Sequence, residues 1–206
     1  MKKNFIALAI AASLMTGCAS TGSSNLTDAE QYAADLEQGK ELYSQSIKGS
    51  YQPSVVDDVE IVRTAVNAAF LVAKPAYEDY SREVNNYREV QTYLKFIEEA
   101  DTEEAKKKAF DVLTAEQQQV ISGFVNNSKT QEIVKGLGEA AQVALKNIAL
   151  FKGVDTTALM KQVSFKDMMA EKDKLALTGN QIAYLSNTVV KSYNSYRQIK
   201  ALVPAQ

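Results

Sequence analysis

The pattern of apolar positions predicts that residues 54–99 form one long helix on which the rest of the chain packs. Apolar or small residues recur at alternating steps of three and four, which is typical of a helix that buries one face. An unbroken helix of this length would span about 65–70 Å. Two rows carry the pattern, interrupted only by Glu83: Val55, Val62, Ala69, Ala76, Val90 and Ile97, and Val59, Val66, Ala73, Tyr80, Tyr87 and Leu94.

Two residues define how this helix begins and bends. Ser54 precedes Asp57 and Asp58, so we expect it to cap the positive end of the helix. Pro75 removes a backbone donor in the middle of the segment. Because the phase of both apolar rows continues past Pro75, we expect a kink near Lys74 rather than a break.

A second long helix is predicted over residues 165–202. Ser164 offers a cap before it, and Pro204 ends it. Small residues at Gly179 and Ser186 predict a close approach to the helix at 54–99. The core row falls at steps of seven: Met168, Leu175, Ile182, Val189, Tyr196 and Val203.

Shorter helices complete an elongated antiparallel helical bundle, which we predict as one all-α domain over residues 27–206. Capping patterns at Thr27, Thr102 and Thr114 each precede an amphipathic segment. A further helix is expected from about Gln131 to Phe151, where Gly136 and Gly138 could allow a neighbour to approach. The predicted spans are about 27–48, 101–113, 114–125, 131–151 and 157–162, and the inward residues of the fourth are Ile133, Leu137, Ala141, Leu145 and Ile148.

The composition agrees with an all-α fold and limits which bonds and partners the chain can have. The 206 residues include three prolines, nine glycines, one cysteine and no histidine or tryptophan. Few turn-forming residues favour helices over a turn-rich β fold, and a single cysteine excludes an internal disulfide. The net charge of −2 gives no reason to expect nucleic acid or anionic lipid as a partner.

The N-terminus has the form of a secretory signal. Lys2 and Lys3 precede the apolar run Phe5–Leu14, which is followed by Met15-Thr16-Gly17-Cys18. The apolar run is too short to span a bilayer, which takes about 20 residues. An ordinary secretory signal with an incidental cysteine is the alternative interpretation.

The tetrapeptide Met15-Thr16-Gly17-Cys18 resembles the lipobox of bacterial lipoproteins, with Met15 in place of the usual Leu. The resemblance covers residues 1–18 only. It implies that a signal peptide (1–17) is removed and that Cys18 carries acyl chains, which attach the chain to a membrane. Because residue 19 is Ala rather than Asp, the resemblance also implies outer-membrane localisation, with the body facing the periplasm. Exposure on the cell surface stays open. We expect residues 18–26 to form a short flexible linker after the acylated cysteine.

The sequence predicts no catalytic, cofactor-binding or metal-binding residues. Histidine and cysteine, on which most nucleophilic triads and zinc or haem sites depend, are missing from the body. Gly136-Leu137-Gly138 has no third glycine and no strand before it, so it is not a phosphate loop. The acidic pairs Glu98-Glu99 and Glu103-Glu104 and the run Lys106–Lys108 fit solvated helix surfaces.

Tyrosines supply the one unusual chemical feature. Ten occur in the chain, and two groups stand on the predicted long helices: Tyr77, Tyr80 and Tyr87 on the first, and Tyr193 and Tyr196 on the second. We favour a position at the border of the core, with each ring buried and its hydroxyl wet. A tyrosine-lined groove for a protein or glycan partner is the alternative. Antiparallel pairing of the two helices would place the two groups at opposite ends.

Three functional hypotheses follow. The first is a non-enzymatic, membrane-anchored accessory or scaffold that binds another envelope component, a protein partner of unknown identity. The second is a carrier for a small apolar or aromatic ligand, with Met160, Met168 and Met169 available to line a pocket. The third and weakest is an enzyme acting on cell-envelope material.

Overall fold

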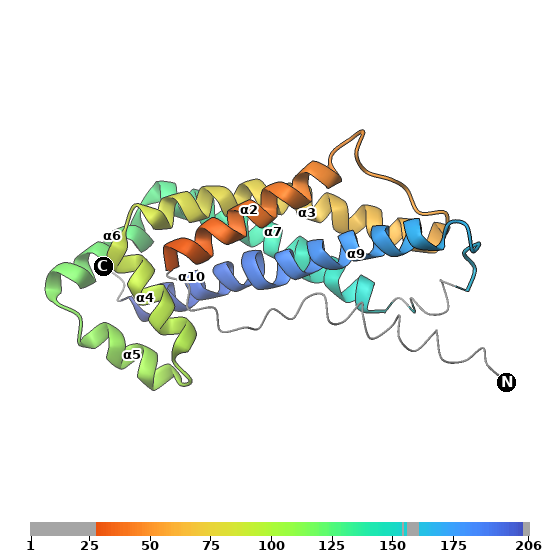
Figure 1. Ribbon diagram of the computed structural model, residues 1–206. Coiled ribbons are helices and arrows are strands. Elements are labelled where there is room, and N and C mark those ends of the chain that lie inside the picture. The colour runs from red at the N-terminus through yellow and green to blue at the C-terminus, as the bar shows by residue number, and fades with distance from the viewer. Residues whose placement is uncertain (1–27, 154, 156–160, 204–206) are drawn as a thin grey trace.

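The protein is an elongated bundle of helices (Figure 1). The computed structural model describes residues 28–153, 155 and 161–203, and these residues contain no β-strand. Four helical stretches form the bundle: α2 (Asp28–Ser46), α3 (Asp57–Asn85), α7 (Ser128–Lys152) and a continuous rod made of α9 (Met168–Tyr184), η1 (Leu185–Val190) and α10 (Lys191–Leu202). The predicted all-α helical bundle is therefore confirmed.

Hydrogen bonds between the helices define their directions. The Tyr77 hydroxyl donates to Asp35 (3.1 Å), and the Asn67 amide donates to the Ser46 carbonyl (3.0 Å), so α2 runs antiparallel to α3. The Lys129 ammonium at the start of α7 lies 2.6 Å from Glu83 near the end of α3, and the two helices pack extensively, so α7 is antiparallel to α3 as well. Successive helices of the bundle thus reverse direction, as expected.

The two longest stretches, however, run parallel rather than antiparallel to each other. Arg63 donates to Thr178 (3.3 Å), and Gln181 donates to Asn67 (2.7 Å), so residue numbers on α3 and α9 rise together. The most extensive partner of α3 is α7, which lies between them in sequence. The expected antiparallel pairing was wrong because an apolar row shows which face is buried and not the direction of the helix that covers it.

The predicted helix over 54–99 is two helices. α3 ends at Asn85, and α4 (Arg88–Glu99) begins after a two-residue connection. The backbone N–H of Asn86 donates to the Glu83 carbonyl (3.2 Å), and that of Tyr87 donates to the Val84 carbonyl (2.9 Å). Asparagine favours such turns because its short amide competes for local backbone hydrogen bonds. The chain therefore breaks at Asn86–Tyr87 and not near Lys74.

Pro75 lies inside α3, and the helix continues through it. Its ring is exposed to solvent. A missing backbone donor is tolerated best on the solvent side, where helical hydrogen bonds are already longer and water can bind the freed carbonyl. Ser54 does not cap this helix, which begins at Asp57. Its hydroxyl donates to Glu171 (2.5 Å) at the start of α9 instead.

The rod from Met168 to Leu202 begins three residues later than expected, and Ser164 forms a turn with Asp167 before it. The π-helical η1 includes the β-branched run Thr188–Val190, which has low α-helical propensity. Gly179 and Ser186 do not make the close contact that the sequence suggested. No atom lies within 4 Å of a Cβ built on Gly179, and Ser186 is exposed.

Close approaches occur at two other glycines, one of which, Gly138, was predicted from the sequence. A Cβ on Gly39 of α2 would lie 2.9 Å from the Tyr184 hydroxyl, and one on Gly138 of α7 would lie 2.6 Å from Cε2 of Tyr193. Of the inward residues predicted on α7, Leu145 is wrong because its side chain is exposed. The helix predicted at 157–162 falls largely outside the described residues.

Three short helices cover one end of the bundle: α4, α5 (Glu103–Asp111) and α6 (Ala115–Asn126) (Figure 1). Two caps predicted from sequence are present. Thr102 accepts from the Ala105 N–H, and Thr114 forms a complete capping box with Gln117. α7 starts at Ser128, earlier than expected, because Asn127 caps it.

Candidate functional site

The end of the bundle that carries α4, α5 and α6 holds the candidate site. α4 is strongly amphipathic: Val90, Tyr93, Leu94 and Ile97 are buried, at the spacing of one helical face. α4 contacts α6 and α10 on this face. Phe96 stands outside the buried rows and stays 48% exposed.

Aromatic rings join these short helices to the bundle. Tyr87 packs edge-on against Phe124 of α6 (5.4 Å between ring centroids), and Phe124 packs against Tyr196 of α10 (6.1 Å). The Tyr196 hydroxyl also donates to the Val125 carbonyl. Such contacts contribute about 0.5–1.5 kcal/mol each beyond the area they bury. They fix α4 and α6 on α10.

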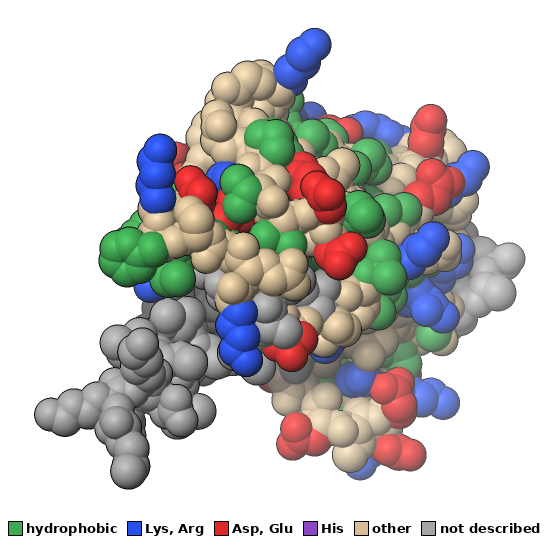
Figure 2. Space-filling model, turned by 90° about the vertical axis from the view of Figure 1, so that its right-hand side faces the viewer, with side chains coloured by type: hydrophobic (Ala, Val, Ile, Leu, Met, Phe, Trp, Pro, Cys, Tyr) green, Lys and Arg blue, Asp and Glu red, His purple; other side chains and the backbone are tan. Residues whose placement is uncertain are grey.

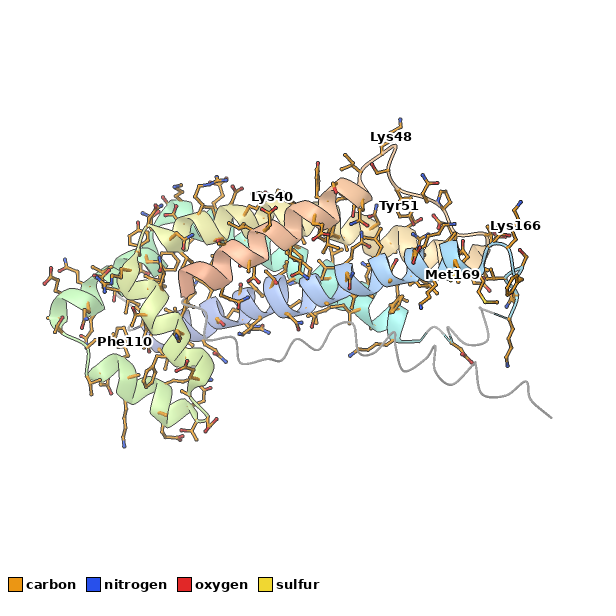
Figure 3. The ribbon with its side chains drawn as sticks, in the orientation of Figure 1. Lys40, Lys48, Tyr51, Phe110, Lys166 and Met169 are labelled. Carbon is orange, nitrogen blue, oxygen red and sulfur yellow. The ribbon has the colours of Figure 1, made fainter. Side chains whose placement is uncertain are left out.

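α5 is held mainly through one aromatic pair. Phe110, labelled in Figure 3, lies 5.7 Å from Tyr93 of α4, and the Tyr93 hydroxyl donates to the Lys106 carbonyl (3.1 Å). Burial, with the Asp111 carboxylate nearby, raises the pKa of Tyr93 to about 12. This hydroxyl therefore stays protonated and keeps its hydrogen bond across the physiological range.

A groove of about 470 Å³ opens between α4, α5 and α6. This volume lies in the range of small-molecule sites, about 300–1,000 Å³. Five of its lining residues are apolar, and the two charged ones, Arg88 and Glu89, stand where α4 begins. The lining residues are Arg88, Glu89, Thr92, Tyr93 and Phe96 of α4, Ala109 of α5, Val112 and Leu113 of the α5–α6 connection, and Gln117 and Ile121 of α6.

The uncharged polar side chains of the lining are each engaged within the protein through one atom. The Thr92 hydroxyl donates to the Arg88 carbonyl (3.1 Å), and the Gln117 amide oxygen accepts from the Thr114 N–H (3.0 Å). Tyr93 is bonded to Lys106 as described above. The groove therefore offers a ligand mostly apolar contact, with Arg88 and Glu89 as the charged groups at one end.

A second cavity, of about 550 Å³, lies between α3 and α7 and is lined by charged residues. Four of its five charged residues pair with one another. Arg82 lies 3.1 Å from Asp79, and Lys129 lies 2.6 Å from the buried Glu83. The paired charges stabilise the α3–α7 contact. This cavity therefore has fewer unpaired charged groups to offer a ligand than the groove has.

The opposite end of the bundle contains a buried polar cluster. Arg63 donates to the carbonyls of Gln52 (3.0 Å) and Lys174 (3.3 Å). Glu171 accepts from the Ser54 hydroxyl, the Val55 N–H and the Lys174 ammonium. Burial raises the pKa of Glu171, but these three hydrogen bonds outweigh it and hold the pKa below its ordinary value. The cluster attaches the loop before α3 to α9, which is a structural role.

The surface at this end is mixed in character. Figure 2 looks onto it, and Lys, Arg, Asp and Glu side chains surround scattered apolar ones. Lys48 and Lys166 point away from the bundle, and Met169 lies on the first turn of α9 (Figure 3). The exposed apolar residues here do not line a described cavity, so we place the candidate site at the α4–α6 end.

The tyrosines for which a groove was the alternative interpretation lie mostly in the core. Tyr77, Tyr80 and Tyr196 are buried, whereas Tyr87 and Tyr193 are half-buried. Because α3 and the rod run parallel, Tyr87 and Tyr196 meet at the same end, on either side of Phe124. None of the five lines the α4–α6 groove.

The cysteine, methionines and lysines singled out in the sequence differ in where they lie and how exposed they are. Cys18 and Met160 lie outside the described residues. Met168 packs at the edge of a small apolar cluster with Val56, Val59, Val163 and Leu175, and Met169 is exposed. Lys107 and Lys108 are exposed as predicted, but Lys106 is buried and its ammonium lies 2.8 Å from Glu103.

Comparison with known proteins supplies no further assignment. No protein family, curated protein or solved structure matches this chain. Among the helices that the structure describes, none combines the length and apolar character needed to cross a bilayer. In the same residues, no group of three or more carboxylate, histidine or cysteine side chains is arranged to hold a metal ion.

Proposed function

We propose that this chain is a bacterial lipoprotein, acylated on Cys18 and anchored in the outer membrane. Its helical bundle binds another envelope component without catalysing a reaction. The tetrapeptide Met15-Thr16-Gly17-Cys18, after a charged and then apolar start, supports the anchor. The binding role rests on the α4–α6 groove with its exposed Phe96 and Val112.

The direction of α2 supports the same reading. Asp35 lies beside Tyr77, and Asp28 is two helical turns before Asp35. Since α2 is antiparallel to α3, Asp28 lies level with the last turn of α3, where α4 is about to begin. A tether from Cys18 therefore leaves the bundle at the end that carries the groove. Ten residues reach at most about 33–36 Å, so the groove stays near the membrane.

Intact-mass measurement tests the anchor. Protein purified from membranes should begin at Cys18 and carry the added mass of acyl chains. The Cys18→Ser variant should lack that mass and leave the membrane fraction, with an unchanged helical circular dichroism spectrum. An unacylated wild-type chain, or unchanged membrane partition of Cys18→Ser, would contradict the proposal.

Site-specific cross-linking tests the binding role. A photoreactive residue at position 112, in the groove, should give a discrete adduct in intact cells. The same residue at position 72 is the matched control, because Val72 is also exposed but lies on α3 outside the groove. Equal adducts from both positions, or none from 112, would exclude the groove as a binding site.

A further inference from the structure

The α4–α6 groove has a chemistry that selects among envelope components. An extended peptide or a glycan presents many donors and acceptors, and each needs a partner once water is removed. The hydroxyls of Thr92 and Tyr93 and the amide oxygen of Gln117 are already engaged inside the protein. The groove therefore suits a ligand whose buried part has no hydrogen-bonding groups.

Polarity changes along the groove. Arg88 and Glu89 stand at the start of α4, and Arg88 makes no ion pair with another described residue. Ala109, Leu113 and Ile121 line the groove together with the internally bonded Thr92, Tyr93 and Gln117. Phe96 and Val112 are its exposed apolar residues. A chain of methylene groups fits the apolar part, and an anionic or zwitterionic head fits beside Arg88.

We propose that the groove binds one acyl chain of a membrane phospholipid, with the head group at Arg88. The inference rests on the proposed anchor, because the tether from Cys18 holds the groove within reach of the bilayer. Insertion removes the edge formed by Phe96 and Val112 from water, and Tyr93 supplies a buried floor. The envelope component that this lipoprotein binds is then a lipid rather than a protein.

Photoactivatable lipid tests this directly. The acylated full-length mature protein is reconstituted in vesicles of phosphatidylethanolamine and phosphatidylglycerol that contain a phospholipid with a diazirine in its acyl chain. After irradiation and proteolysis, mass spectrometry should locate adducts on residues 88–99 and 109–121. Adducts confined to the segment around Cys18 would overturn the proposal.

Three variants test whether the lipid adducts depend on the groove. Val112→Glu adds a charge to the apolar edge, and because Val112 is 80% exposed the fold should be kept. It should lower the groove adducts about tenfold, whereas Val72→Glu on α3 should leave them unchanged. Arg88→Glu should lower the yield with a phosphatidylglycerol probe more than with a phosphatidylethanolamine probe. Equal yields in Val112→Glu and wild type would overturn the proposal.

The measurements distinguish failure of the proposed membrane anchor from failure of the lipid-binding proposal. Absence of acyl mass on Cys18 is the failure of the proposed anchor. An acylated protein that gives no lipid adduct in the groove refutes the lipid inference alone. A large adduct at position 112 in cells, with no lipid adduct in vesicles, identifies a protein partner and likewise refutes it.

Discussion

Gly138 offers a direct test of how α7 packs against α10. A Cβ at this position would lie 2.6 Å from Cε2, 2.8 Å from Cζ and 3.0 Å from the hydroxyl oxygen of Tyr193. Gly136, two residues earlier on the same helix, has no atom within 4 Å of its built Cβ. The two glycines therefore separate backbone propensity from packing, within one helix and with one substitution.

The two substitutions should change the free energy of unfolding in opposite directions. Gly136→Ala removes the helical penalty of glycine and should stabilise the protein by up to about 1 kcal/mol. Gly138→Ala brings the same gain, but overpacking costs about 1–3 kcal/mol. The half-buried Tyr193 ring can move partly outward, so we expect a net loss of about 1 kcal/mol. The two variants should differ by about 1–3 kcal/mol in free energy of unfolding.

Urea unfolding followed by circular dichroism measures this difference, and thermal unfolding should show it as about 2–4 °C per kcal/mol. The Tyr193→Ala background is the control. Without the ring, Gly138→Ala should stabilise as much as Gly136→Ala does, which gives a coupling energy between positions 138 and 193. Equal stabilisation by both alanines in the wild-type background would refute the reasoning.

Two further predictions concern the ends of the bundle. The pKa of Glu171 is lowered in the folded state. The ionised carboxylate therefore adds to the free energy of unfolding above the ordinary glutamate pKa, and this stabilisation is lost as pH falls through the lower folded pKa. Glu171→Gln should therefore flatten the acid side of the urea midpoint plotted against pH; an acid side as steep as in wild type would contradict this. Thr114→Ala should lower the free energy of unfolding by about 0.5–2 kcal/mol because it removes the cap of α6. Thr114→Ser keeps the hydroxyl and should lose much less, and equal losses in the two variants would argue against the cap.

Local signals in the sequence were sufficient for most helices. The caps at Thr102 and Thr114 depend on residues three apart, and the structure forms both. The break at Asn86–Tyr87 was missed because the apolar rows of α3 continue in phase into α4, where Val90 and Leu94 are also buried. The adjacent asparagines at 85 and 86 were the available signal, and they outweigh Pro75, which breaks nothing.

The groove was less accessible from sequence because three helices build it. Its floor residues, such as Ile121, read as ordinary core positions. Phe96 and Val112 were the one hint, since both are large and apolar and stand outside the buried rows. The apolar pattern also could not predict helix direction, because an apolar row is the same for a parallel and an antiparallel neighbour. The parallel direction is shown by two hydrogen bonds in the folded structure, Arg63–Thr178 and Gln181–Asn67.

The two ends of the bundle differ in how firmly they are held, and this bears on where a ligand can enter. At one end, Arg63 and Glu171 cross-link the loop before α3 to α9 through several buried hydrogen bonds. At the other, the buried residues of α5 are only Lys106, Ala109 and Phe110. Local opening is easiest where few apolar contacts must separate. We therefore expect any opening of the groove to begin at α5. It would separate α5 from both α4 and α10 and break the Tyr93–Lys106 hydrogen bond and the Tyr93–Phe110 ring contact.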